Sequence, residues 1–328
     1  MVHAFKILHQ SQPSILEDAV KRFYVFSLVA VVLLGFTAIA SAKDIGVAWV
    51  GKSGMANRVN AGLEKGLADK GINIEFSKEM GSTDELGPLF AKWSSEKDGI
   101  VLLRSNGAKW LGKNPPSIPT FIGGCNNPVV LGTVKNMDAP GGNITGVTYF
   151  IDPDYMLPIF QALLPDMNSI ALIVDANNPS AGVDMQSTKA ACGKNGITYN
   201  EVKVTSKDEA AQKIGELSGK VSAIILGTQA LLMDATAELV AAAGNTPVLA
   251  YNKKSVSEGA LAGFAADDNK LGMMLADIVV DVVINGKPIG SIPVAVDPEP
   301  GLYLNEGAAE KFGITIPEEL MESIKLVK

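Results

Sequence analysis

The chain has 328 residues, of which 47% are hydrophobic and 19% charged, and its formal net charge is -7. This composition supports a large buried core and disfavours disorder, and the length is typical of about two domains. The acidic balance argues against a nucleic-acid partner, because phosphates require a basic surface.

Residues 1–42 form a distinct N-terminal segment. Lys21 and Arg22 precede a long apolar run that ends in Ala-Ser-Ala at 40–42, the small-x-small pattern of a signal peptidase site. The run also has about the length of a bilayer span, so a retained membrane anchor stays open as the alternative. In either case we expect the chain from Lys43 onward to be exported to the periplasm.

Both histidines, His3 and His9, lie in this segment. The chain from Lys43 onward therefore contains no histidine, which excludes Ser-His-Asp and Cys-His catalysis and disfavours a zinc site. We expect a protein that is not an enzyme, with no metal and no cofactor.

From residue 44 onward, short apolar runs alternate with helical patterns. Strands are predicted at 44–50, 72–76, 99–103 and 120–124, with helices at 55–71 and 86–93 between them. Such βαβ alternation is typical of a parallel sheet.

The same alternation then begins again. Strands are predicted at 170–175, 197–204, 221–226 and 247–251, and helices at 183–191, 206–219 and 230–243. Ser206 and Glu209 have the spacing of a capping box. A long helix at 271–286 and a strand at 291–296 follow.

The stretch PGGNITGVTYF at 140–150 separates the two series. It is not a P-loop, because no lysine follows Gly146, and adjacent Gly141 and Gly142 break the dinucleotide-binding pattern. We interpret it as a connector whose strand at 143–149 enters the second lobe. The chain then returns to the first lobe and again to the second, which predicts two hinged lobes around a cleft.

Three blocks carry a family resemblance: PGGNITGVT, GALAGFAADDNKLGMMLADIVVDVVINGKPIGSIPV and LYLNEGAAEKFGITIPEEL. In this order they resemble the ABC transporter substrate-binding family that includes tryptophan/tyrosine-type uptake proteins. The resemblance implies the α/β fold of type I periplasmic binding proteins, with two Rossmann-like lobes of parallel sheet joined by a three-strand hinge. The sequence departs from the family at Asn127-Pro128-Val129, where members usually carry Asp-Pro-Val.

The expected lobe boundaries follow from the two series and the resemblance. Lobe one takes residues 43–145 and 267–295, and lobe two takes 146–266 and 296–328. We expect the hinge segments near 142–148, 262–268 and 290–300, where the chain passes between the lobes.

The resemblance also implies a function. The protein would capture a small polar metabolite, such as an amino acid, between the lobes and deliver it to an ABC permease in the inner membrane, acting as a monomer. A periplasmic sensory subunit that reports the ligand to a membrane signalling protein stays open as the alternative.

Ligands of parallel sheets bind beyond the carboxyl ends of the strands, where small polar side chains gather in this sequence. The predicted ligand-binding residues are Ser53, Arg104, Ser105, Asn106, Cys125, Asn126, Asn177, Asn178, Thr228, Gln229, Tyr251, Asn252 and Asp267.

Three of these residues carry specific expectations. Arg104 is either a bidentate ligand for a carboxylate or a solvated surface residue, and Asp267 either accepts a ligand ammonium or caps a helix. Cys125 and Cys192 are expected on different lobes and therefore as free thiols, with Cys125 at the cleft and Cys192 packed as a small apolar residue.

Overall fold

The structure is a computed structural model that describes residues 42–328. The predicted signal peptide or anchor lies outside the described residues, apart from Ala42. Between Ala42 and Lys328, none of the helices has both the length and the apolar character that a membrane span requires.

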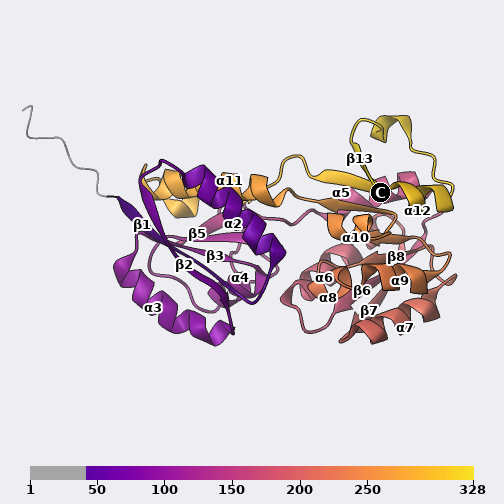
Figure 1. The fold of residues 1–328 in the computed structure, drawn as a ribbon, viewed down its shortest axis with the longest axis horizontal. Coiled ribbons are helices and arrows are strands. Elements are labelled where there is room, and N and C mark those ends of the chain that lie inside the picture. Colours follow the sequence, from indigo (N-terminus) through magenta and orange to yellow (C-terminus); the bar gives the residue numbers. More distant parts are fainter. Residues whose placement is uncertain (1–41) are drawn as a thin grey trace, which may run out of the picture. The chain divides into compact units, whose positions relative to one another are not determined.

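Lobe one is built on a six-stranded sheet in the order β11-β5-β4-β3-β1-β2 (Figure 1). Its strands are β1 (Lys43–Val50), β2 (Ile72–Met80), β3 (Gly99–Leu103), β4 (Thr120–Cys125), β5 (Ile144–Thr148) and β11 (Ala295–Val296). Its helices are α2 (Gly54–Leu67), α3 (Leu86–Glu96), α4 (Ser105–Leu111), α11 (Asp268–Val283) and the short 3-10 turns Thr83–Glu85 and Ile289–Ser291. All of its strand pairs are parallel, as the alternation of strands and helices predicted.

Both faces of this sheet are covered by helices. Val101 and Leu103 of β3 pack with α2 and α11 on one face. Ile100 and Leu102 pack with α3 and α4 on the other. Successive side chains of a strand point to opposite faces, so a sheet covered twice requires strands that are apolar throughout. This explains the unbroken run GIVLL.

Lobe two is built on a seven-stranded sheet in the order β13-β12-β10-β9-β8-β6-β7. Its strands are β6 (Ser169–Asp175), β7 (Thr198–Val204), β8 (Ala223–Leu226), β9 (Val248–Ala250), β10 (Ala262–Ala265), β12 (Gly301–Asn305) and β13 (Ile324–Val327). Its helices are α5 (Pro153–Leu163), α6 (Pro179–Lys194), α7 (Lys207–Leu217), α8 (Ala230–Met233), α9 (Thr236–Ala243), α10 (Lys253–Ser257), α12 (Glu306–Lys311) and the 3-10 turn Glu318–Leu320. Its strands pair in parallel except for β10 and β12, which are antiparallel.

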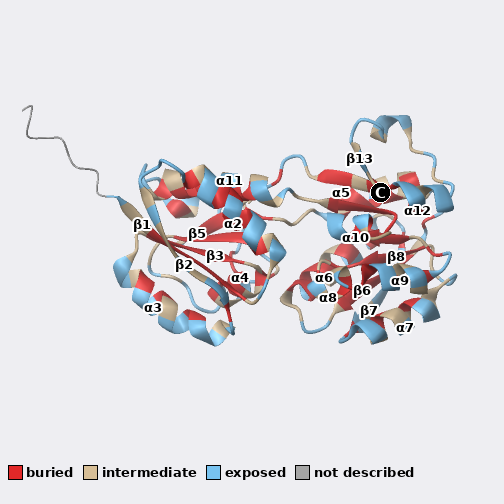
Figure 2. Cartoon of the chain, in the orientation of Figure 1, coloured by how far each residue is buried: buried red, intermediate tan, exposed pale blue. Residues whose placement is uncertain are grey.

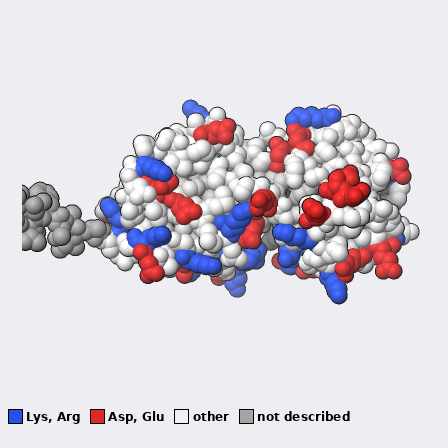
Figure 3. Space-filling view, turned by 90° about the horizontal axis from the view of Figure 1, so that it is seen from above, with Lys and Arg blue, Asp and Glu red and all other residues white. Residues whose placement is uncertain are grey.

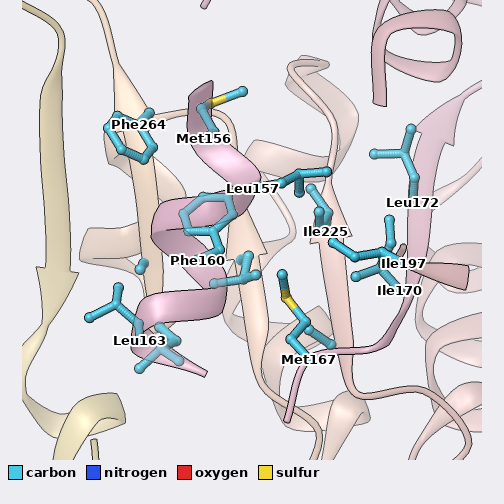
Figure 4. Packing of buried hydrophobic residues seen from close by; sticks show 14 of the residues in the cluster. Met156, Leu157, Phe160, Leu163, Met167, Ile170, Leu172, Ile197, Ile225 and Phe264 are labelled. Atoms are coloured by element: carbon cyan, nitrogen blue, oxygen red, sulfur yellow. The ribbon is translucent and has the colours of Figure 1, made fainter. Parts of the chain in front are cut away.

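The core of lobe two also lies on both faces of its sheet, whose central strands are buried (Figure 2). Helix α5 presents Leu157 and Phe160 to Ile170 and Ile225 on one face (Figure 4). Ala171 and Ile173 of β6 belong to the cluster on the opposite face, formed with α7 and α9. Charged side chains of both signs are interspersed on the molecular face shown in Figure 3.

Helices α2 and α11, far apart in the sequence, approach closely in lobe one. A Cβ atom on Gly62 would lie 2.2 Å from the carbonyl oxygen of Asn269, and one on Gly272 would lie 2.1 Å from that of Val59. Only glycine leaves room for backbones this close. Helix α11 therefore packs against α2, the first helix on the sheet of lobe one.

The described chain passes between the two sheets three times. The passages are residues 149–152, 266–267 and 297–300. The second and third fall within the expected hinge segments, but the first begins after the expected 142–148. The reason is that β5 pairs with β4 and β11 in lobe one, so the expectation that this strand enters lobe two is wrong.

Three other local predictions are corrected. The helix expected at 230–243 is interrupted at Asp234 and Ala235, giving α8 and α9. The strand expected at 291–296 is limited to Ala295–Val296: Ser291 ends a 3-10 turn, and the amide of Val294 donates to the carbonyl of Met137 rather than to a neighbouring strand. At the start of α7 the Ser206 hydroxyl accepts from the amide of Glu209. The Glu209 carboxylate, however, accepts from the amide and hydroxyl of Thr205 rather than from Ser206.

Candidate functional site

A small cavity of about 20 Å³ lies where the two lobes meet. Its wall combines one lobe-one residue, three residues of the first passage and a larger contribution from lobe two. The lining residues are Asn126, Tyr149, Phe150, Ile151, Pro153, Met156, Asp184, Ser187, Thr228, Tyr251 and Phe264.

The polar end of the cavity is organised around Asp184 of α6, which is 3% exposed. Its carboxylate accepts from Asn126 Nδ2 of lobe one at 2.8 Å. Within lobe two it accepts from the amide and hydroxyl of Thr228, at 2.8 and 3.0 Å, and from Gln229 Nε2 at 2.6 Å. A buried carboxylate is therefore surrounded by donors from both lobes.

The ionisation of Asp184 is subject to two opposing influences. Burial raises the pKa of its carboxyl group, and the donors from Thr228, Asn126 and Gln229 oppose that rise. Each of these partners directs a hydrogen at the carboxylate, so a proton on either oxygen would face another donor. These donors favour the anion, but burial is the larger influence and keeps the pKa of Asp184 above its ordinary value. A positive charge beside the carboxylate would favour the anion further.

A second polar contact crosses between the lobes beside the first. Ser180 Oγ of α6 lies 3.0 Å from Ser105 Oγ of α4, and it donates to that oxygen. Ser105 Oγ also accepts from the amide of Asn126 at 2.9 Å. The Tyr149 hydroxyl lies 3.2 Å from Ser180 Oγ. Burial first, and then the charge of Asp184, raise the pKa of Tyr149 to about 12, so its hydroxyl stays protonated.

The rest of the cavity wall is apolar and rich in aromatic rings. The hydroxyl of Tyr251 lies 2.8 Å from Thr188 Oγ1, which fixes the orientation of the ring. Phe264 packs edge-on against Tyr155, with 5.5 Å between ring centroids. A ligand in this site would meet one charged group, a few hydroxyls and amides, and a largely apolar surface.

Several predicted site residues meet here. Asn126, Thr228 and Tyr251 line the cavity. Ser105 and Gln229 stand behind it, bonded to Asn126 and Asp184 respectively.

Other predicted residues act as helix caps. Ser53, Asn178, Asn252 and Asp267 each accept backbone amides at the start of a helix. Asp267 was expected either to accept a ligand ammonium or to cap a helix, and the structure shows it capping α11. Asn177 lies in an exposed turn, where its amide donates to Asp175 Oδ1.

Arg104 lies at the carboxyl end of β3, outside the cavity lining. Its guanidinium donates to the carbonyl of Val50 in the same lobe. Asn106 lies beside it, with Nδ2 3.5 Å from that carbonyl. Among the described residues no carboxylate pairs with Arg104, and partial burial lowers the pKa of its guanidinium. Its backbone has φ of 76°, a value that few residues other than glycine adopt.

Both cysteines are free and buried, as expected of residues on different lobes. Cys125 was expected at the cleft, but it does not face it. Its side chain is fully buried in the lobe-one core, with the sulfur 3.9 Å from the carbonyl oxygen of Val147. Cys192 packs in the lobe-two core.

Sequence reasoning missed Asp184, Ser180 and Tyr149. A signal for two of them was present in α6, where Ser180, Asp184 and Thr188 recur every fourth residue and so share one helix face. Ser180, Asp184 and Thr188 are all buried. A polar stripe on a helix that must pack against a sheet indicates a polar surface beneath it.

Among residues 42–328, no group of histidine, cysteine, aspartate and glutamate side chains has the arrangement of a metal site. The cavity lining itself offers hydrogen-bonding groups, one carboxylate and apolar contact.

Comparison with known proteins assigns the chain to a family. Residues 45–328 match the family model described as ABC transporter substrate binding protein. The chain belongs to this family. It is 26% identical over 297 residues to a tyrosine-binding protein of Clostridioides difficile (strain R20291), covering 87% of this chain and 85% of the relative.

Solved structures give the same fold. An ABC domain from Streptococcus pneumonia in complex with L-Trp has a TM-score of 0.73 at 23% identity, covering 87% of this chain and all of that one. A ligand-free, open substrate binding protein with adhesive properties from Clostridium difficile has a TM-score of 0.72 at 25% identity, covering 87% and 99%. The predicted type I periplasmic-binding-protein fold is confirmed.

Proposed function

We propose that this family member is a periplasmic solute-binding protein that holds an amino acid with an apolar or aromatic side chain between its lobes. It would deliver the ligand, as a monomer and without catalysis, to an ABC permease in the inner membrane. The observation that carries the proposal is the buried Asp184 carboxylate at the polar end of an otherwise apolar cavity. At about 20 Å³ this cavity has room for about one water, so an amino acid would enter only with the lobes further apart than they are here.

The charge of Asp184 favours a ligand that bears an ammonium group. A buried anion is costly unless it is paired, and a cation within hydrogen-bond distance makes the strongest pairing. Among the cavity-lining residues, no lysine or arginine supplies such a cation. A ligand ammonium would complete the charge balance.

The remaining lining favours an apolar or aromatic ligand side chain. Phe150, Met156, Tyr251 and Phe264 offer ring faces and a thioether, which suit flat apolar groups. Two similar proteins point the same way, since one is named as tyrosine-binding and another was solved with L-Trp.

Delivery to a permease is proposed from family membership and from the hinged architecture. A ligand that contacts both lobes favours the closed arrangement, and a permease can distinguish closed from open. Residues 43–148 with 268–296, and 153–265 with 301–328, would then move as the two lobes. The sensory alternative would use the same closure to signal to a membrane protein.

Ligand binding can be tested with the chain from Lys43 onward by thermal shift and calorimetry. L-tyrosine and L-tryptophan should raise the melting temperature, and a ligand at a hundredfold over its Kd should add about 2.7 kcal/mol of stability. The des-amino analogue 3-(4-hydroxyphenyl)propionate should not, because it brings a second carboxylate to Asp184 without an ammonium.

A variant pair sharpens this test. Asp184→Asn should weaken binding of the amino acid at least tenfold, whereas Asp166→Asn, which removes the same charge from an exposed turn, should not. Equal binding of the amino acid and its des-amino analogue would contradict the assigned role of Asp184.

A further inference from the structure

The two oxygens of the Asp184 carboxylate have different partners. Oδ2 accepts from lobe two alone, through the amide and hydroxyl of Thr228 and through Gln229 Nε2. Oδ1 accepts from lobe one, through Asn126 Nδ2 at 2.8 Å. One carboxylate is therefore anchored in its own lobe by one oxygen and reaches across to the other lobe with the second.

The partner on lobe one is also held by a hydrogen bond within its own lobe. Asn126 Oδ1 accepts from the amide of Asn127 at 2.9 Å, so the side-chain amide has its NH₂ group turned toward Asp184. The main-chain amide of Asn126 donates to Ser105 Oγ. Asn126 is 1% exposed. Each end of the contact thus has hydrogen bonds within its own lobe as well as the one between the lobes.

We propose that Asn126 and Asp184 form a latch that draws the lobes together by a hydrogen bond of the protein itself. Thr228 and Gln229 are its positioning residues, because they aim Oδ1 at lobe one by occupying Oδ2. The latch sets how often the cleft is open, which regulates access to the site named in the proposed function. It does not depend on which ligand that site takes.

The energetics favour a measurable effect. A hydrogen bond to a charged group contributes more than one between neutral groups, and a buried one is costly to leave unmade. On opening, water replaces Asn126 at Oδ1 while the Oδ2 bonds persist. The latch therefore biases an equilibrium between two arrangements without holding either permanently.

Because Asn126 donates and Asp184 Oδ1 accepts, exchanging the two side chains should restore the hydrogen bond that each single variant removes. Asn126→Asp alone sets two carboxylates against each other, and Asp184→Asn alone sets two NH₂ donors against each other. The double variant exchanges donor and acceptor across the same contact. An amide at position 184 can keep its oxygen on the three lobe-two donors and turn its NH₂ toward lobe one, which restores the latch.

The experiment measures the distance between the lobes in the chain from Lys43 onward, which forms one compact unit. Spin labels at exposed positions, introduced by Lys113→Cys and Lys189→Cys, report that distance by double electron–electron resonance without any ligand. The native thiols are buried and spared. Asn127→Asp is the matched control: it adds the same charge one residue away, where the side-chain oxygen accepts from Val129 and Val130.

Asn126→Asp should shift the distances to longer values, Asn127→Asp should match the unsubstituted protein, and the double variant should return toward it. The latch is overturned if Asn126→Asp gives the same distances as its control, or if the double variant stays as open as Asn126→Asp. Should Asp184→Asn prevent folding, the comparison of Asn126→Asp with Asn127→Asp still decides. Failure of the amino acids to bind would refute the proposed ligand and leave this result unaffected.

Discussion

The backbone amide of Asp267 donates a 2.9 Å hydrogen bond to Oδ2 of Asp297. These residues lie on the second and third passages between the lobes, so the bond ties two of the three passages together. The other oxygen of Asp297 accepts from the amide of Glu299 and pairs with Lys270 of α11 at 2.8 Å. The Asp297 side chain is 1% exposed. The two passages are thus fastened to lobe one as a unit.

Asp297→Asn is expected to loosen this junction. An amide keeps one acceptor but loses the charge that binds Lys270, and a buried charge-assisted bond contributes about 1.5–3 kcal/mol. Urea denaturation of the chain from Lys43 onward should show a loss of that order. Asp281→Asn, which breaks the surface pair with Lys287, should cost much less. Similar losses for the two variants would mean that the buried contacts of Asp297 contribute no more than a surface ion pair.

Gly272→Ala is expected to destabilise lobe one by about 1–3 kcal/mol or more, because the added methyl group would overlap the backbone of α2. The matched control is Gly182→Ala in α6, where a Cβ atom meets nothing within 4 Å. That substitution should be neutral or slightly stabilising, since alanine favours the helix. Thermal unfolding of both variants gives the comparison, and a stable Gly272→Ala protein would mean that the helices separate easily.

Glu75 should contribute to the acid sensitivity of the protein. Lys97 at 2.6 Å, with Lys92 at 3.1 Å, lowers the pKa of Glu75 from its ordinary 4.5 to about 2. A lowered pKa means that the unfolded state binds the proton first, so the stabilisation is present above pH 4.5 and is lost as the pH falls toward 2.

Glu75→Gln should therefore flatten the decline in unfolding free energy over that interval. Denaturation curves at several pH values measure it. Glu319→Gln in the exposed 3-10 turn is the control and should leave the slope unchanged. An identical slope for Glu75→Gln would show that Glu75 keeps an ordinary pKa.

Most of the fold could be predicted because its central strands are apolar on both faces. Both boundaries of strand β3 were predicted correctly, since GIVLL is a continuous apolar run bounded by polar residues. The predictions that failed depend on contacts from distant residues. β5 resembles a strand of either lobe, and only its pairing with β4 and β11 places it in lobe one.

The candidate site was less accessible to sequence reasoning. Strand ends led to Asn126, Thr228 and Gln229, because ligands of parallel sheets bind beyond the carboxyl ends of the strands. Asp184 follows no strand; it lies in the second turn of α6, and its importance arises from donors that the fold brings from two other segments. An aspartate on a helix is usually exposed, so the residue type alone does not indicate that Asp184 is buried at a site.

The return of α11 to lobe one has a consequence for how the protein is made. Synthesis runs from the N-terminus, so strands β1 to β5 emerge long before the helix that covers one face of their sheet. Until residues near Gly272 are available, the part of this face that α11 covers has no partner, although α2 can already pack on the strands. Contacts between such distant residues form slowly, and exposed sheet surface invites aggregation in the meantime. We therefore expect the first half of the chain to expose apolar surface until α11 packs against it.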